Sequence, residues 1–414
     1  MGKIDNILPI FYVRGYNPPY TEGHLQVVRG MVKSLLLKNI RSAVFNYKYN
    51  IRFQNAEYVL KNGEGAGELK FEQNIPLIDR EDIFHQSIKS KIVYASLMET
   101  LAIPRFLSIE RHIGRYGRCI VNVINCFRYP RILAKKFSDL PVVLHMYTRK
   151  AIMKNTIKML IDRADLVVTS SKSLACHVEK NYDIHKMGIQ TIYPPVDTEV
   201  YKPIDKNQSR RRLALKRPVK LLLYVGNLRE NRFPEDIILR LMKKLAKRDP
   251  KIKLLIFSPQ NHENMKRRIE ILAKASAFNL RQNIKINVRN LSEIEKSMVY
   301  SASDLFIFPP LKSGEAVEPP ITVLEAMSCG LPVVSSDVTS ITEVITDEID
   351  GLIIPFGTGD PSFLEEQISS LLEDNHVRME FSYNARRNVI EKFSLHSSCK
   401  RFLGILRNLS KSSP

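Results

Sequence analysis

The sequence lacks several patterns that would define its class directly. No apolar run approaches the ~18 residues that a membrane-spanning helix needs, and no charged and apolar leader with a cleavage site opens the chain. The five cysteines are odd in number and form no Cys-x-x-Cys pair, which argues for reduced thiols and against a zinc site. No Asp-x-Asp pair of the kind that binds a metal ion is present. These absences predict a cytoplasmic protein that has no metal site.

Acidic residues are scarce relative to basic ones. The chain carries 63 lysine and arginine residues against 43 aspartate and glutamate residues, a formal net charge of +20. Such an excess attracts nucleic acid, an anionic membrane face or phosphorylated ligands. No RNA-binding aromatic pair, zinc finger or recognition-helix pattern accompanies the basic residues, so nucleic acid is not the expected partner.

The length and the strand patterns predict two α/β domains. At 414 residues the chain is long enough for about two domains, each with its own core. Residues 1–200 and 218–392 are the expected domains, and the basic, polar stretch 201–217 is the expected linker. Each expected domain opens with an apolar run, NILPIFYVR at 6–14 and VKLLLY at 219–224, of the kind found in parallel strands covered on both faces.

A basic region extends from Leu101 to Lys150. It contains ten lysine or arginine residues, Arg149 among them, against two acids, with apolar residues in between. This composition predicts a surface that binds an anionic membrane face, where each nearby lysine or arginine adds ~1 kcal/mol. A charged face that is merely solvated is the alternative.

The glycine-rich segment NGEGAG, at 62–67, invites comparison with a phosphate-binding loop. It lacks the Gly-Lys-Ser/Thr ending that opens a helix in such loops. We therefore predict a hairpin or a flexible turn there.

The most informative stretch runs from Glu315 to Ser336 and reads EAVEPPITVLEAMSCGLPVVSS. Its two prolines favour a helix start, so we expect a helix over 321–328, ended at Gly330, and a strand over 333–335. The first N–H groups of a helix have no intrahelical partner and carry partial positive charge. This helix start is therefore a candidate anion site, with Glu325 one turn further along.

EAMSCGLPVVSS resembles the donor-site motif of the retaining GT-B glycosyltransferases of group 1, also called family 4. In that family an earlier acidic residue precedes the Glu-Ala-Met helix. Its position here is Val317, with Glu318 one place later and Glu315 two places earlier. The resemblance implies that Glu325 accepts hydrogen bonds from the ribose of a nucleotide sugar. It leaves the contact with the sugar open among Glu318, Glu315 and backbone groups.

A second stretch, VGNLRENRFP at 225–234, resembles the family turn that sets two basic residues against the donor diphosphate. Arg232 stands at one basic position and Asn227 at the other, and Arg229 is near enough in sequence to substitute for Asn227. Surface arginines on a loop are the alternative. The resemblance assigns the diphosphate to Gly226, Arg229, Arg232 and the amides of Ile321, Thr322 and Val323.

Three weaker matches complete the implied site. The loop NPPYTEGH retains Gly23 from a family loop that approaches the diphosphate and the acceptor. The strand over 141–147 carries His145, the best match to a family histidine whose imidazole or backbone carbonyl contacts the donor sugar near its C6 hydroxyl; a structural histidine is the alternative. Asn290 and Leu291 follow an expected strand over 284–288 and would hold the base through backbone groups.

The resemblance implies the GT-B fold: two Rossmann-like αβα domains that face each other across a cleft, with a helix over 393–414 that crosses back to the first domain. It implies metal-independent transfer of a sugar, with retention of configuration, to a lipid-linked or glycan acceptor. GDP-mannose is the favoured donor, a UDP-sugar is the other, and no cofactor is expected. The basic first domain favours a peripheral location on the cytoplasmic membrane face. A GT-B epimerase or hydrolase and a non-catalytic GT-B binding subunit are the alternatives, since a fold outlives its functions.

Overall fold

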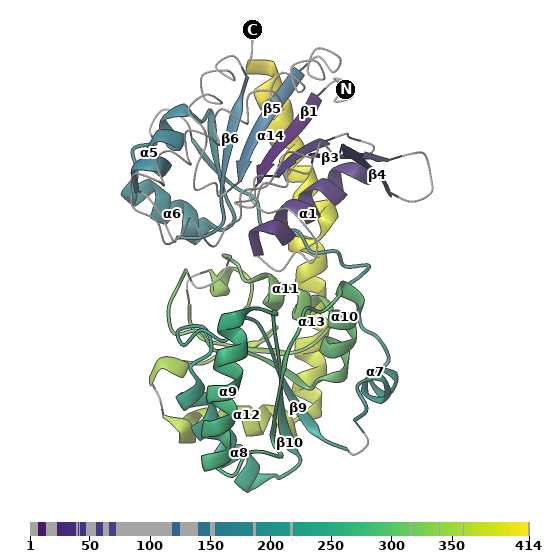
Figure 1. Cartoon of the computed structure of the whole chain (residues 1–414), viewed down its shortest axis with the longest axis vertical. Helices are drawn as coiled ribbons and strands as arrows, with labels where there is room; N and C mark the ends of the chain where they lie inside the picture. Colours follow the sequence, from purple (N-terminus) through teal and green to yellow (C-terminus); the bar gives the residue numbers. More distant parts are fainter. Residues whose placement is uncertain are drawn as a thin grey trace.

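The computed structural model shows two α/β domains, one above the other in Figure 1. It describes residues 7–13, 23–38, 40, 42–46, 55–60, 66–71, 118–124, 140–149, 154–184, 188–215, 218–314, 317–338, 340–358 and 360–412. The N-terminal domain lies at the top of Figure 1 and the C-terminal domain at the bottom. No helix within these ranges combines the length and the apolar character needed to cross a bilayer.

The C-terminal domain is built on a parallel sheet whose described strands follow the order β11-β10-β9-β12-β13-β14. The chain moves outward from β9 through β10 to β11 and then returns to the other side of β9 with β12. In sheets of this order, ligands bind where the direction reverses, here at the carboxyl ends of β9 and β12. The strands are Lys220–Val225 (β9), Ile252–Ser258 (β10), Ile284–Val288 (β11), Leu305–Phe308 (β12), Val333–Ser335 (β13) and Leu352–Ile353 (β14).

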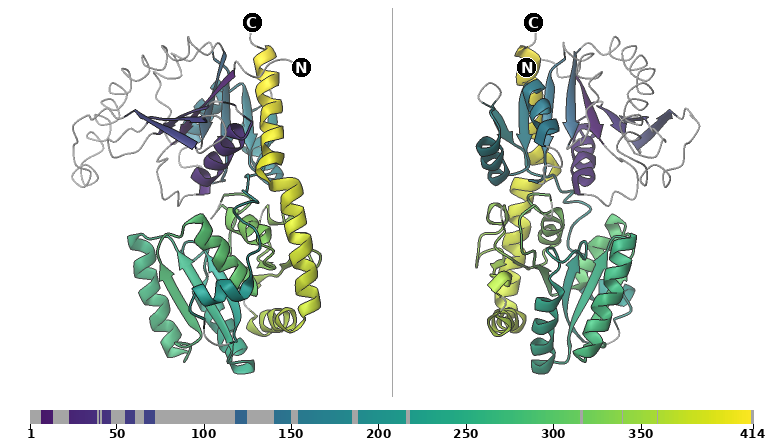
Figure 2. Two further views of the ribbon diagram at one scale, coloured as in Figure 1. Left: turned by 90° about the vertical axis from the view of Figure 1, so that its right-hand side faces the viewer. Right: turned by 60° about the vertical axis from the view of Figure 1, so that its left-hand side comes forward.

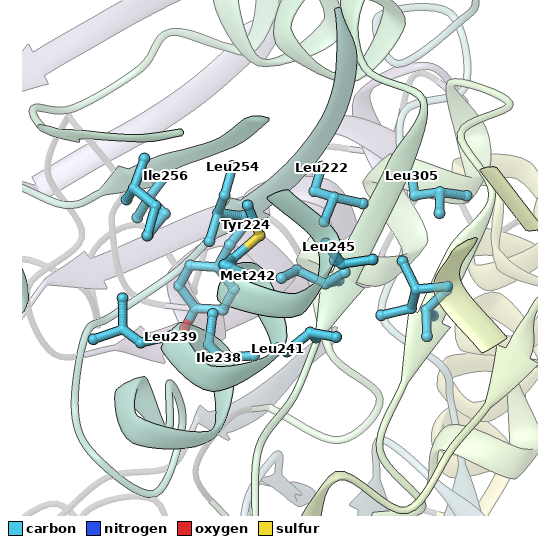
Figure 3. Close-up of a cluster of buried hydrophobic side chains, with 14 of the residues drawn as sticks. Leu222, Tyr224, Ile238, Leu239, Leu241, Met242, Leu245, Leu254, Ile256 and Leu305 are labelled. Atoms are coloured by element: carbon cyan, nitrogen blue, oxygen red, sulfur yellow. The ribbon is translucent and has the colours of Figure 1, made fainter. Parts of the chain in front are cut away.

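Alternate residues of each strand feed two separate cores, because successive side chains point to opposite faces of a sheet. Leu222 and Tyr224 pack with α8, whereas Leu221 and Leu223 pack with the other set of helices. Figure 3 shows the first core, with the apolar face of α8 against β9 and β10. The helices are Glu235–Arg248 (α8), His262–Ala277 (α9), Glu293–Ala302 (α10), Ile321–Ser328 (α11), Pro361–Glu373 (α12) and Asn375–Phe393 (α13).

The N-terminal domain holds a sheet whose described strands follow the order β4-β3-β2-β1-β5-β6-β7-β8. All neighbours are parallel except β2-β3 and β3-β4. β3 and β4 pair antiparallel, with Leu60 opposite Ala66, as the predicted hairpin requires of the flanking strands. Residues 62–65 of the glycine-rich segment lie outside the described residues. The strands are Ile7–Val13 (β1), Ser42–Asn46 (β2), Asn55–Leu60 (β3), Ala66–Phe71 (β4), Arg118–Ile124 (β5), Val142–Met146 (β6), Leu166–Thr169 (β7) and Ile189–Thr191 (β8).

The last helix of the chain completes the core of the N-terminal domain. Figure 2 shows α13 and α14 (Leu395–Ser412) running along one side of both domains. Phe402 of α14 packs against Phe11 of β1 with ring centroids 5.8 Å apart. The buried side chains of α1 belong to the same core. The described helices of this domain are Gly23–Leu36 (α1), Lys154–Arg163 (α5) and Lys172–Asn181 (α6).

Two chain segments cross between the domains side by side. The N–H of Val196 donates to the carbonyl of Phe393 at 2.8 Å, and the N–H of Leu395 donates to the carbonyl of Val196 at 3.0 Å. α1 leans on this crossing through Gly30, where an added Cβ would lie 2.7 Å from Cγ of Pro195. Any change in the relative orientation of the domains therefore has to bend these paired segments.

The stretch predicted as the linker contains a short helix, α7 (Lys206–Arg212), that is anchored to the C-terminal domain. Nη2 of Arg210 lies 2.7 Å from Asp304 and Nζ of Lys206 lies 2.6 Å from the same carboxylate. Two basic residues of this stretch, Lys206 and Arg210, are thus paired with a carboxylate of the C-terminal domain.

Most of the basic region from Leu101 to Lys150 lies outside the described residues. The membrane surface that we expect there stays a prediction.

Candidate active site

The loops after β9 and β12 meet where the strand order of the C-terminal sheet reverses. The N–H of Leu311, in the loop after β12, donates to the carbonyl of Asn231, in the loop after β9, at 2.8 Å. The first loop carries the Gly226 turn and the second leads into α11. Both halves of the predicted diphosphate site therefore lie at one edge of the sheet.

Gly226 follows β9 in a crowded space. A Cβ at this position would lie 2.7 Å from the Tyr224 hydroxyl oxygen and 3.2 Å from Nε of Arg232. The Tyr224 hydroxyl donates to the carbonyl of Asn227 at 2.6 Å. Burial raises the pKa of Tyr224 to about 12, although the positive charge of Arg232 acts in the opposite direction. Arg232 therefore lies directly beside the turn where the sequence placed it.

Arg229, the other predicted basic group, turns to α9. Its side chain is half exposed, and its Nε lies 3.2 Å from Oε2 of Glu263. The structure thus separates the two arginines, with Arg232 beside the turn and Arg229 paired with a surface carboxylate.

Asn264 is a site residue that the sequence reasoning missed. It is fully buried, and its Oδ1 accepts from the N–H of Leu228 at 3.0 Å. Its Nδ2 donates to Oδ1 of Asn227 at 3.0 Å and to the carbonyl of Pro259 at 2.8 Å. One amide therefore fixes the loops after β9 and β10. Its only sequence signal is its position at the first turn of a helix, three residues after the cap Asn261.

The helix predicted over 321–328 is α11, and it begins and ends where expected. Pro320 precedes it without a side-chain cap, and the left-handed Gly330 (φ 69°) follows its end. The N–H of Val323 donates to the carbonyl of Pro320 at 3.1 Å. The expected anion contact of the Val323 amide therefore competes with a bond inside the protein. The amides of Ile321 and Thr322 lie in the first turn, directly after the segment that carries Glu318.

Glu325 is held by the protein more firmly than predicted. Its side chain is 2% exposed, and Nζ of Lys296 donates to its two oxygens at 2.9 and 3.2 Å. The Tyr300 hydroxyl donates to Oε2 at 2.8 Å, and burial together with the Glu325 charge raises the pKa of that hydroxyl. A carboxylate has about four lone-pair positions, so these donors leave little room for a further hydroxyl.

A cavity of about 30 Å³ lies between α1, the domain crossing and α11, with Glu325 in its wall. Two ion pairs join α1 to the C-terminal side of this cavity. Nη1 and Nη2 of Arg29 donate to Glu293 at 2.5 and 3.0 Å, and Lys33 pairs with Asp197. A cavity of this size holds a water molecule or two.

The loop after β11 is ordered by its own side chains. Oδ1 of Asn290 accepts from the N–H of Gln260 at 3.1 Å, and Leu291 packs against the neighbouring core. Ser292 and Glu295 cap α10 reciprocally, and this backbone bond lowers the pKa of Glu295 to about 2. Side chains therefore fix the backbone of this loop, and the predicted role of Asn290 and Leu291 in binding the base stays a prediction.

Glu318 faces the N-terminal domain. Its side chain is 4% exposed, and both carboxylate oxygens accept from Nε of Arg149 at 3.1 and 3.0 Å. Its N–H donates to the carbonyl of Tyr147 at 3.0 Å. Burial raises the pKa of Glu318, and Arg149 acts against that shift. The placement of Arg149 on an outward basic surface was therefore wrong, because its guanidinium binds the displaced acid.

His145 lies in the core of the N-terminal domain. It is fully buried, with Nε2 3.0 Å from Oδ1 of Asn122 and Nδ1 3.3 Å from the Tyr147 hydroxyl. Its ring centroid is 5.9 Å from that of Phe402 on α14. Protein atoms enclose the imidazole, so the predicted contact of this ring with a donor sugar is wrong. A contact through the backbone carbonyl of His145 stays a prediction.

Replacing His145 by glutamine is expected to make folding less sensitive to acid. Burial lowers the pKa of His145 to about 3, whereas an unfolded histidine titrates near 6.5. The unfolded state therefore binds the proton first, and the native protein loses stability as the pH falls through this window. Between pH 7.5 and 4.5 this loss amounts to about 2 to 3 kcal/mol, and His145→Gln should lack it. Urea unfolding at both pH values measures the difference, and equal losses in the two proteins would contradict it.

Two predicted site residues fall at or beyond the limits of description. Gly23 is the first residue of α1, and the loop at 14–22 that precedes it is outside the described residues. Glu315 is also outside them. Their roles stay predictions.

Residues 205–388 match the family model described as glycosyl transferases group 1. The matched segment contains the Gly226 turn, the loop after β11 and the whole of α11. This segment is therefore similar to the group 1 glycosyl transferases. In the C-terminal domain, the motifs that carried the resemblance lie at the carboxyl edge of the sheet.

The chain is also similar to curated glycosyltransferases and to the synthase described next. N-acetyl-alpha-D-glucosaminyl L-malate synthase of Bacillus anthracis is 25% identical over 246 residues, which cover 58% of this chain and 59% of that protein. The chain thus spans roughly half the length of the curated relatives that it matches.

Two solved structures align over nearly the full chain. Sucrose-phosphate synthase from Thermosynechococcus elongatus has a TM-score of 0.72 at 16% identity, covering 98% of this chain and 100% of that one. HepE of Anabaena in complex with UDP has a TM-score of 0.66 at 14% identity, covering 97% and 99%. The likeness confirms the predicted GT-B fold.

Proposed function

We propose that the chain is a glycosyltransferase that moves a sugar from a nucleotide sugar to a lipid-linked or glycan acceptor, with retention of configuration. The observation that supports this best is that the Gly226 turn, with Arg232 beside it, and the loop that leads into α11 lie at the same edge of a sheet within the segment that matches the group 1 model. A turn without side-chain bulk, a guanidinium and a helix start are together suited to a diphosphate.

In this proposal the diphosphate lies between Arg232 and the first turn of α11. The guanidinium donates to phosphate oxygens in a forked arrangement, and the amides of Ile321 and Thr322 donate from the other side. These groups stabilise the negative charge that the diphosphate gains as it leaves. Arg229 contributes once its bond to Glu263 yields to the ligand.

The reaction breaks the bond between the anomeric carbon and the diphosphate oxygen and forms a bond from that carbon to an acceptor oxygen. The acceptor approaches from the face that the diphosphate leaves, and its proton passes to a phosphate oxygen of the departing nucleotide. No protein base and no divalent ion is needed for this balance. Glu318, whose loop leads into α11, is the acid proposed to orient the sugar.

The nucleoside part of the donor is assigned to the other side of α11. Glu325 is proposed to bind the ribose at the lone pairs that Lys296 and Tyr300 leave, and backbone groups of Asn290 and Leu291 are proposed to bind the base. HepE of Anabaena is described in complex with UDP-glucose as well as UDP, which supports testing UDP-sugars beside GDP-mannose. The net charge of +20 supports an acceptor on an anionic membrane face.

A panel of UDP- and GDP-sugars tests the proposal. Thermal stabilisation by at least one nucleotide sugar and transfer of its radiolabelled sugar to membrane extract are the expected results. Turnover of the nucleotide sugar with no acceptor present would indicate an epimerase or hydrolase instead. Binding without any turnover would indicate a non-catalytic subunit. If no nucleotide sugar of the panel bound, the proposed donor site would be contradicted.

Gly226→Ala is expected to weaken UDP or GDP binding about tenfold, because an added Cβ displaces the Tyr224 ring and the Arg232 guanidinium. Tyr224→Phe removes the oxygen that lies nearest to that Cβ. The double variant should therefore recover part of the affinity, as measured by titration calorimetry. Unchanged affinity in Gly226→Ala would place the diphosphate elsewhere.

A further inference from the structure

A chain of hydrogen bonds joins the two domains beside α11. Nε of Arg149, from the N-terminal domain, donates to both oxygens of Glu318 at 3.1 and 3.0 Å. Nη2 of the same guanidinium donates to Oγ of Ser173, the second residue of α6, at 2.5 Å. Arg149 therefore connects the acid of the C-terminal domain to a helix start of the N-terminal domain.

The chain continues from Ser173 to a second carboxylate of the C-terminal domain. The N–H groups of Lys172 and Ser173 each donate to Glu343 at 2.8 Å, and the Tyr193 hydroxyl donates to Oε2 of Glu343 at 2.9 Å. A carboxylate at the first turn of a helix satisfies N–H groups that have no intrahelical partner and complements the helix dipole. Glu318, Arg149, Ser173, Glu343 and Tyr193 form what we call the interdomain clamp.

We propose that Arg149 is a positioning residue of the sugar transfer, which holds Glu318 in place only while the interdomain clamp joins the two domains. This inference rests on the proposed function and adds a residue of the N-terminal domain to the donor site. Arg149 acts by holding Glu318 in position, since its guanidinium contacts this carboxylate and not the groups proposed to bind the diphosphate.

The backbone of Glu318 is held from the same side as its carboxylate. Its N–H donates to the carbonyl of Tyr147 at 3.0 Å, and its own carbonyl accepts from the Ser170 hydroxyl. Tyr147 and Ser170 follow β6 and β7 of the N-terminal domain. Every one of these contacts to Glu318 comes from the opposite domain, so separating the domains releases the acid and its loop together.

Because the Glu318 carboxylate is buried, it needs the Arg149 guanidinium as a partner for its charge. The Glu318 side chain is 4% exposed and that of Arg149 is 22% exposed. Removing one partner of such a pair leaves the other charge buried and unpaired, which costs far more than a surface ion pair is worth. A lysine keeps the charge but lacks the two nitrogens that here bind Glu318 and Ser173 at once.

The charged groups that face Glu318 are Arg149 and Glu343. Burial and Glu343 raise the pKa of Glu318, and Arg149 lowers it. Without Arg149 the acid therefore protonates at a higher pH than in the wild type. If the ionised acid orients the sugar, the acidic limb of the pH profile moves upward in the variant.

Steady-state kinetics of Arg149→Met, Arg149→Lys and Arg248→Met test the inference. Arg248 is the matched control, because it binds Glu373 and Glu365 inside one domain. We expect Arg149→Met to lower kcat about 30-fold, with a shifted acidic limb and an unchanged Kd for the nucleoside diphosphate. Arg149→Lys should recover part of kcat, and Arg248→Met should match the wild type. Wild-type kcat and pH profile in Arg149→Met would overturn the inference, even if its melting temperature falls.

Glu343→Gln separates closure from positioning, because it weakens the bonds to α6 and leaves the Arg149–Glu318 pair in place. Amide exchange at residues 172 and 173 should accelerate in this variant without any substrate. If the wild-type protein bound no nucleotide sugar, the proposed function would be contradicted and, with it, the role of Arg149 in positioning Glu318 for sugar transfer. Faster exchange in Glu343→Gln would still show that the domains are clamped, so the two failures are distinguishable.

Discussion

Replacing Glu325 by alanine is expected to lower kcat/KM for the nucleotide sugar at least about 100-fold and to destabilise the fold by about 3 to 5 kcal/mol. Two effects combine. The ribose loses its acceptor, and the Lys296 ammonium, whose side chain is 15% exposed, stays in place without its carboxylate. Kinetics at saturating acceptor and urea unfolding measure the two effects separately.

The double variant Glu325→Ala/Lys296→Met distinguishes these effects. Removing both charges takes away the buried unpaired ammonium, so most of the stability should return. Nucleotide binding should stay weak, because the ribose acceptor is still missing. Recovery of activity together with stability would mean that Glu325 serves the fold alone and that the ribose binds elsewhere.

Arg232→Ala is the second large expected effect, a loss of about 100- to 1,000-fold in kcat. The guanidinium lies beside the Gly226 turn and is proposed to stabilise the leaving diphosphate, where no other described side chain of that turn carries a positive charge as close. Arg229→Ala should cost less, at most about tenfold, because its side chain is half exposed and paired with Glu263. Single-turnover rates of both variants provide the comparison. Equal losses would contradict the separation of the two arginines.

The second domain was predicted closely because its signals are local. The apolar run of β9, the strand pattern of β11 and the two prolines before α11 each determine an element within a few residues, and all of these elements lie where expected. The family motif indicated which of these elements belong to the expected donor site. It could not show that Glu325 is already bound to Lys296 and Tyr300, because these partners lie on another helix, 29 and 25 residues away.

The interdomain contacts were beyond the reach of the sequence. Arg149 and Glu318 are 169 residues apart, and nothing local distinguishes Arg149 from the other basic residues around it. The environment of the His145 ring was mispredicted for a related reason, since its burial depends on Phe402 of α14, far along the chain. Local patterns specify strands, turns and helix starts, whereas the environment of a charge depends on which distant elements pack around it.

Arg29 and Lys33 could have been anticipated in part. They are four residues apart on α1, so they share one face of the helix, and both bind acids beside the cavity at Glu325. Their spacing indicates a basic helix face. Only the structure shows that this face of α1 contacts the C-terminal domain, through the Arg29–Glu293 ion pair.

Amide hydrogen exchange with and without UDP or GDP tests the proposed donor site, because it reports where a nucleotide binds. We predict slower exchange in three separated segments, the Gly226 turn, the loop after β11 and the first turn of α11, with no such protection in Arg232→Ala. Protection confined to other parts of the chain, or equal protection in the variant, would contradict a nucleotide-sugar site at this edge of the sheet.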